Sequence, residues 1–260
     1  MLKLPLVLVR VLFVVAWSVV WITAAVVMTL LTLNRELALR LARTVWAPGI
    51  LWGCGVELEV EPLPDFDWST PHIFTMNHQS MLDIPCAFAA LPVNLRFVAK
   101  HTLAYVPFLG WYMALTGMVF INRSERRKAL ASLKLAGERI RGGANILAYP
   151  EGTRTLDGAI LPFKKGPFAL AAEARVPIVP VAIDGSSRAL PAKTLWILGG
   201  RVRLKVGPPL VTDSLPLVTR DVLLHQTRAA LIRLHRDIGG KGGDSRDVAV
   251  EGTEGIAVPL

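Results

Sequence analysis

Beyond residue 55 the chain alternates short apolar runs with segments of helical periodicity, and this alternation constrains the fold more than any other feature. Helical patterns lie between most of the apolar runs, which is typical of a domain built from alternating strands and helices. The pattern predicts an α/β fold with a mixed, largely parallel sheet of about seven strands flanked by helices. The candidate strands are Val56–Val60, His72–Met76, Leu95–Ala99, Met118–Ile121, Asn145–Tyr149, Ile178–Ile183 and Val202–Val206.

Two segments of this domain allow sharper local predictions. The clearest helix covers residues 125–141, with Ser124 as its N-cap and Gly142 at its end. Pro177 and Pro180 lie at and within a candidate strand, where each removes a backbone N–H donor. We therefore expect that strand at an edge or a bend of the sheet.

The N-terminal region holds a run of 23 residues without a charged side chain, from Val11 to Leu33. As a helix this run would be about 35 Å long, against a hydrocarbon core of roughly 30 Å. A secretory signal peptide has a shorter apolar region, about 7–15 residues, followed by a cleavage site. The length of the run and the helical pattern after it favour a membrane helix.

A second helix is predicted directly after this run. Asn34 is a suitable N-cap, and Pro48-Gly49 ends the pattern. Apolar residues recur at every fourth position: Leu37, Leu41 and Val45. Basic residues on both sides of the apolar run mildly favour a segment that does not cross the membrane. We predict a two-helix membrane anchor in residues 1–54; one spanning helix followed by an ordinary surface helix is the alternative.

The net charge of +9 is concentrated in one part of the chain. Residues 96–165 hold twelve lysines and arginines against four acidic residues. Such a surface attracts nucleic acid, anionic lipid headgroups or phosphorylated substrates, and the apolar N-terminal run favours the lipid. The two cysteines, Cys54 and Cys86, have neither disulfide-framework nor zinc-ligand spacing, so we expect two buried thiols and no metal site.

His78 and Asp83 lie in a polar block that follows a candidate strand and leads into a helix. A neutral imidazole can take a proton near neutral pH, and a carboxylate on its other nitrogen would fix the tautomer. The pair can meet if His78 lies in the loop and Asp83 in the first helical turn. The alternative is structural: Asp83 precedes Ile84-Pro85 and could be an ordinary N-cap.

Two further blocks place cations after candidate strands. Arg123 ends the block 117–123, and the block 149–154 follows another strand with Glu151, Gly152, Thr153 and Arg154. Ligand sites in open α/β sheets lie at the carboxyl ends of strands, and guanidinium groups bind phosphate bidentately. Each arginine alone is more often a solvated surface charge, so the prediction of a phosphate site rests on the two together.

These blocks and the proline-containing strand, in this order, resemble the glycerolipid acyltransferase family, in particular bacterial 1-acyl-glycerol-3-phosphate acyltransferases. The resemblance runs from about Thr75 to Val181 and includes the segments 99–111 and 164–168. Two positions depart from the family pattern. Tyr149 stands where the family usually has Phe, and Asn122 where Asp is common. Both departures leave the choice of substrate open.

The resemblance implies acyl transfer from an acyl thioester, acyl-CoA or acyl-carrier protein, to a lysophospholipid hydroxyl, with no cofactor. It implies that His78 is the general base for the acceptor hydroxyl and that Asp83 orients it. The side chains implied to hold the acceptor phosphate are Lys100, Arg123 and Arg154. Glu151, Gly152 and Thr153 would shape the acceptor site, although Glu151 could instead form a structural ion pair.

Three other functions remain as alternatives. A serine hydrolase would need a G-x-S-x-G nucleophile elbow, and the closest string, at residues 185–189, lacks the second glycine. A non-catalytic membrane protein that binds phosphate would account for the charge but not for His78 and Asp83. A family member that acylates another lysolipid, such as lyso-ornithine lipid, would share the same blocks.

The predicted organisation is therefore an anchor in residues 1–54, a catalytic domain in residues 55–238 and a mobile tail in residues 239–260. Membrane attachment suits a substrate whose acyl chains partition into the bilayer. We expect the inner (cytoplasmic) membrane with the active site at its cytoplasmic face, an anionic lipid surface as partner, and no nucleic acid.

Overall fold

A single mixed sheet forms the centre of the molecule in the computed structural model, which describes residues 3–121, 126–210 and 220–243. Its strand order is β1-β7-β6-β2-β5-β3-β4; β6 and β7 pair antiparallel, and the other five pairs are parallel. The predicted α/β fold is confirmed, with every predicted strand within two residues. The strands are β1 (Val56–Val60), β2 (Ile73–Met76), β3 (Leu95–Lys100), β4 (Val119–Ile121), β5 (Asn145–Ala148), β6 (Ile178–Asp184) and β7 (Gly200–Val206).

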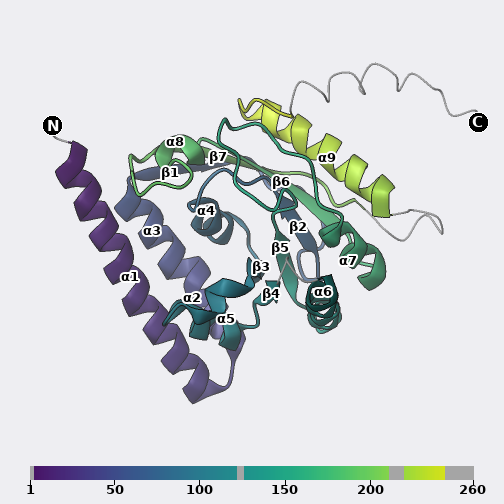
Figure 1. Cartoon of the computed structure of the whole chain (residues 1–260), viewed down its shortest axis with the longest axis horizontal. Helices are drawn as coiled ribbons and strands as arrows, with labels where there is room; N and C mark the ends of the chain where they lie inside the picture. Colours follow the sequence, from purple (N-terminus) through teal and green to yellow (C-terminus); the bar gives the residue numbers. More distant parts are fainter. Residues whose placement is uncertain (1–2, 122–125, 211–219, 244–260) are drawn as a thin grey trace, which may run out of the picture.

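Helices cover both faces of this sheet (Figure 1). One face carries the N-terminal helices together with the helices between β2 and β4: α1 (Lys3–Thr32), α2 (Arg35–Leu41), α3 (Ala47–Cys54), α4 (Asp83–Ala90) and α5 (Leu109–Thr116). The other face carries α6 (Arg126–Arg141), α7 (Gly166–Ala174) and α9 (Arg220–Asp237). Short helical segments complete the chain: a π-helical turn (Ala42–Trp46), a 3₁₀ helix (His101–Tyr105) and α8 (Ser186–Ala189).

Two hydrophobic layers hold the helices to the sheet, because successive strand residues point to opposite faces. In β2, Ile73 belongs to the hydrophobic cluster that includes residues of α6 and α7, while Phe74 and Met76 belong to the cluster that includes residues of α3 and α4. All residues of β2 and β6 are buried, so these central strands are near-continuous apolar runs without polar alternation. Because β2, β3, β5 and β6 run parallel, their carboxyl ends lie along one edge of the sheet, where loops can carry polar groups.

The predicted position of the proline-containing strand is wrong. β6 lies at the centre of the sheet between β2 and β7, and Pro180 is opposite Thr75 of β2. The ladder with β7 begins only at Val181, and Gly207 N–H donates to the Pro180 carbonyl at 2.8 Å as β7 ends. Pro180 therefore lacks its N–H where the ladder ends, so a central strand tolerates it.

The prediction that Pro48-Gly49 ends the second helix is also wrong. Asn34 is the N-cap of α2, as predicted, and its side chain accepts from Glu36 N–H. The helix then continues through the π-helical turn into α3. Pro48 stands in the first turn of α3, where a helical N–H needs no partner in the same α-helix. The helix ends instead at Gly55, its C-cap.

Gly49 is needed for packing. Gly49 and Gly53 lie one turn apart on α3, and a Cβ on either would stand within 2.3 Å of the Trp17 ring or 2.0 Å of the Phe13 ring of α1. The indole N–H of Trp17 donates to the Trp46 carbonyl at 3.1 Å. The two glycines therefore let the aromatic face of α1 lie directly against the backbone of α3.

The outer face of α1 has no such partner. Its segment Leu4–Thr32 is long and apolar enough to cross a membrane, and little of it is buried inside the protein. Leu12, Val20 and Leu31 are among the apolar side chains that it exposes. Among the described residues, α1 is the one helix long and apolar enough to cross a membrane.

The first residues of the predicted tail are held against the domain. Gly240 N–H donates to the carbonyl of His235 in α9, and Ile160 N–H donates to the Gly242 carbonyl, each at 2.8 Å. Residues 244–260, the rest of the predicted tail, lie outside the described residues, as do Ser124 and Glu125 at the predicted start of α6.

Candidate active site

His78 and Asp83 meet at the carboxyl end of β2. The loop after β2 carries His78, and Asp83 is the first residue of α4. His78 Nδ1–H donates to Asp83 Oδ2 at 2.7 Å; the His78 side chain is 15% exposed and the Asp83 side chain is fully buried. The structure thus places the two residues in the arrangement that general-base chemistry requires.

Asp83 turns away from its own helix. Oδ2 accepts the backbone N–H groups of Gln79 at 2.7 Å and Ser80 at 2.9 Å, and Oδ1 accepts the hydroxyl of Ser186. Asp83 is thus not the N-cap of α4, which begins after Leu82 without a side-chain cap. Four donors surround this fully buried carboxylate and fix its orientation toward His78.

Residues that follow β5 hold the backbone and the ring of His78 in place. His78 N–H donates to Glu151 Oε1 at 2.7 Å, and Thr155 N–H donates to the His78 carbonyl at 2.9 Å. The Tyr149 ring stacks on the imidazole at a centroid distance of 4.0 Å and 21° between planes. These contacts restrict rotation of the imidazole, so Nε2 stays directed away from Asp83.

Glu151 contacts the loop that carries His78, but it does not line the apolar cavity beside His78. Its second oxygen, Oε2, accepts Leu161 N–H at 2.9 Å, so its carboxylate links the His78 loop to the segment after β5. Burial raises the pKa of Glu151 to about 8, although the amides of Leu161 and His78 act in the opposite direction. The geometry therefore favours a positioning role over contact with substrate.

An apolar cavity of about 420 Å³ opens beside His78. Its walls come from α1, α2, the π-helical turn, α4, β3 and α5, and include Trp21, Ala38, Phe88 and Met113. Pockets of roughly 300–1,000 Å³ with apolar walls and few polar groups are typical of small-molecule sites. This cavity suits a hydrocarbon chain, and His78 is one of the few polar side chains in its lining.

Cationic groups lie at the same cavity. Lys100, the last residue of β3, and Arg154, in the loop after β5, both line it, as does Gly152. Gly152 has φ of 72°, a backbone conformation that favours glycine, and it lets the chain turn after Tyr149. Thr153 is exposed and outside the lining, and Arg123 lies outside the described residues.

Sequence reasoning missed two groups of the site, Ser186 and the ring of Tyr149. Ser186 is 107 positions after Gln79, but it follows β6, the strand that pairs with β2. Adjacent parallel strands bring their carboxyl ends together, so the order of strands would have been needed to find it. Tyr149 was noted only as a departure from the family pattern, and its stacking on His78 depends on the β2–β5 pairing.

Comparison with known proteins identifies the family of this chain. The acyltransferase family model matches residues 57–184. A human 1-acyl-sn-glycerol-3-phosphate acyltransferase alpha is 31% identical over 192 residues, with 73% of this chain and 68% of the human protein covered. A chloroplastic 1-acyl-sn-glycerol-3-phosphate acyltransferase from Brassica napus is 37% identical over 61% of this chain. The chain belongs to the acyltransferase family.

A solved structure shows the same fold. The 1-acyl-sn-glycerophosphate acyltransferase PlsC from Thermotoga maritima superposes with a TM-score of 0.79 at 24% identity, covering 91% of this chain and 95% of that one. The curated relatives are often longer: the chain spans 46% of the Brassica protein and 57% of a 1-acyl-sn-glycerol-3-phosphate acyltransferase from Saccharomyces cerevisiae. The family match includes His78, Asp83 and residues 149–154.

Proposed function

We propose that this chain transfers an acyl group from a thioester, acyl-CoA or acyl-carrier protein, to the free hydroxyl of 1-acyl-glycerol 3-phosphate, forming phosphatidic acid. One observation supports this above the others: the His78–Asp83 pair opens on an apolar cavity that also has Lys100 and Arg154 in its lining. The relatives named above carry the same activity in their names.

The chemistry follows from the free nitrogen of His78. Because Nδ1–H is bound to Asp83, the neutral ring has its lone pair on Nε2 and can accept the proton of the acceptor hydroxyl. The hydroxyl oxygen attacks the thioester carbonyl carbon, and the C–S bond breaks as the tetrahedral intermediate collapses. The imidazolium then returns its proton to the leaving thiolate. Asp83 orients the imidazole and stabilises the imidazolium while it carries that proton.

The acceptor's phosphate needs cations, and its acyl chain needs an apolar environment. Lys100 and Arg154 supply positive charge at the cavity, and Arg123 is the third proposed cation of this group. The exposed apolar face of α1 would place this cavity at a membrane, where lysolipid and product reside. We propose the cytoplasmic face of the inner membrane, with anionic lipids attracting the basic stretch.

An acceptor panel tests this proposal. Purified protein in vesicles would receive labelled acyl-CoA or acyl-carrier protein together with lysophosphatidate, glycerol 3-phosphate, lysophosphatidylcholine or lyso-ornithine lipid. We expect transfer chiefly to lysophosphatidate, and none with His78→Ala. Equal or preferred transfer to lyso-ornithine lipid would replace the proposed acceptor, whereas transfer by His78→Ala would overturn the mechanism.

A further inference from the structure

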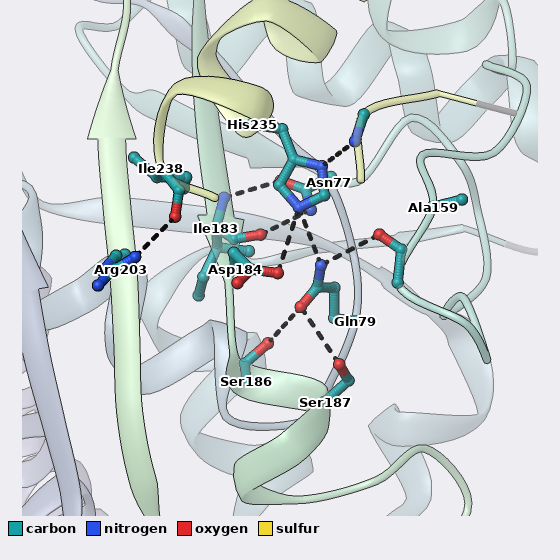
Figure 2. A network of polar contacts seen from close by, with 12 residues as sticks. Asn77, Gln79, Ala159, Ile183, Asp184, Ser186, Ser187, Arg203, His235 and Ile238 are labelled. Atoms are coloured by element: carbon teal, nitrogen blue, oxygen red, sulfur yellow. Dashed lines mark hydrogen bonds and ion pairs between the residues drawn. The ribbon is translucent and has the colours of Figure 1, made fainter. Parts of the chain in front are cut away.

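A second histidine–carboxylate pair, His235 and Asp184, lies beside Gln79, the residue that follows His78 (Figure 2). His235, near the end of α9, has Nε2 3.6 Å from Oδ1 of Asp184, the last residue of β6. Arg188 of α8 donates to the other oxygen of Asp184 at 2.7 Å. The His235 side chain is fully buried, so its position depends on these contacts and on its packing.

The segment after α9 determines which nitrogen of His235 carries the proton. Gly242 N–H donates to Nδ1 at 3.1 Å, so a neutral ring has its proton on Nε2. Gly240 packs on the ring so closely that a Cβ there would stand 2.1 Å from Nε2. The C-terminal turn therefore directs a hydrogen-bond donor from His235 toward Asp184 and the His78 loop.

Gln79 lies between His235 and Ser186. Its amide nitrogen is 3.2 Å from His235 Nε2 and 3.4 Å from the Gly158 carbonyl, and its amide oxygen is 3.5 Å from the Ser186 hydroxyl. An amide turned by 180° has the same shape, and in that orientation its oxygen accepts from Nε2–H of His235 and its nitrogen donates to Ser186. Gln79 is fully buried, so these contacts lie away from bulk solvent.

Ser186 connects Gln79 to the proposed catalytic pair, His78 and Asp83. Its hydroxyl donates to Oδ1 of Asp83, while Oδ2 of the same carboxylate holds His78. We propose that Ser186, with Gln79 and His235 behind it, is a positioning residue that holds Asp83 in the rotamer that serves His78. The inference rests on the proposed acyl transfer and adds residues from α8 and α9 to that site.

The physical consequence concerns the rate of transfer rather than substrate affinity. Gln79, Ser186 and His235 are absent from the lining of the cavity beside His78, so none is placed to touch the acyl chain or headgroup. Losing the Ser186 hydroxyl leaves Oδ1 of a buried carboxylate with one donor fewer. A hydrogen bond to a charged group of this kind corresponds to a change of roughly tenfold to a hundredfold in rate.

The test measures kcat and KM for acyl transfer in four variants. Ser186→Ala should lower kcat about tenfold or more with KM unchanged within about twofold. His235→Leu should lower kcat about tenfold, and His235→Gln should restore most of it, because a glutamine amide can donate from nearly the same place as Nε2. If the path acts as a unit, Ser186→Ala/His235→Leu should be no slower than the slower single variant.

Matched controls separate this role from a loss of stability. Thr227→Val removes another fully buried hydroxyl, which donates to Leu223 within α9, and should leave kcat unchanged while thermal unfolding is recorded for every variant. Wild-type kcat in Ser186→Ala, or multiplicative losses in the double variant, would overturn the inference. Failure of the proposed function is distinguishable, because wild-type protein would then transfer no acyl group to any acceptor of the panel.

Discussion

In the part of the chain that the structure describes, two histidine–carboxylate pairs lie at neighbouring strand ends, and we propose a catalytic role for one of them. His78 and Asp83 follow β2, whereas Asp184 ends the adjacent β6 and meets His235 of α9. The first pair is joined at 2.7 Å and the second at 3.6 Å. Residue type is the same in both, so other features separate their roles.

The two pairs differ in whether the second imidazole nitrogen of the histidine is open to the cavity. In His78 one nitrogen is bound to Asp83 and the ring lines the cavity. In His235 the other nitrogen is occupied by Gly242 N–H, and the side chain is fully buried. Burial alone would raise the pKa of Asp184, but the nearby His235 and Arg188 outweigh it and hold that pKa below its usual value. A histidine–aspartate pair therefore predicts a base only where one nitrogen can reach substrate.

Exchanging each carboxylate for an amide should give the largest difference between the pairs. Asp83→Asn removes the negative charge that fixes the tautomer of His78 and stabilises its imidazolium, so kcat should fall about a hundredfold or more. Asp184→Asn should lower kcat about tenfold and mainly reduce the unfolding temperature, because Arg188 loses its partner. Steady-state acyl transfer with thermal unfolding measures both, and equal losses of kcat would contradict the comparison.

The cations of the cavity should give a smaller effect, and on affinity rather than rate. Lys100→Ala or Arg154→Ala should raise KM for lysophosphatidate about tenfold, because each removes a charge-assisted contact worth roughly 1.5–3 kcal/mol. Lys134→Ala, an exposed lysine on α6 across the sheet, serves as the matched control. An unchanged KM in both cavity variants would indicate an acceptor without a phosphate.

Glu151 should affect the pH dependence of stability more than activity. Since its pKa is about 8 in the folded protein and near 4.5 in a free chain, the folded state retains a proton that the unfolded state loses between these values. The free energy of unfolding should therefore decrease as pH rises from about 4.5 to 8, by an amount on the order of a few kcal/mol.

Thermal unfolding of wild type and Glu151→Gln across that range measures this effect. The variant cannot ionise at residue 151, so its unfolding temperature should change less with pH than that of the wild type. Equal pH dependence in the two proteins would show that Glu151 is already ionised near pH 5 in the folded state.

Local sequence patterns predicted the sheet well, because each strand is a short apolar run whose burial depends little on its partners. The same reasoning placed His78 and Asp83 correctly relative to β2 and α4, where five residues of one loop determine the contact. It misread Pro180 and Pro48-Gly49, since their roles depend on where β7 ends and on how α1 packs on α3.

The contacts of Ser186 and His235 could not be predicted for a related reason. Each is more than 100 positions from the residue of the His78 loop that it contacts. Only the pairing of β2 with β6 and the packing of α9 on β6 bring them together. Strand order is set by the whole core, and a single sequence does not display it.

The most direct measurement is kcat for acyl transfer to lysophosphatidate by His78→Ala and by His235→Leu, in the same vesicles and with unfolding temperatures recorded. General-base catalysis contributes about a hundredfold to ten-thousandfold, so His78→Ala should lose at least that lower amount without loss of lipid binding. His235→Leu should lose about tenfold. Equal losses in the two variants, or a wild-type rate in His78→Ala, would contradict the assignment of His78 as the base.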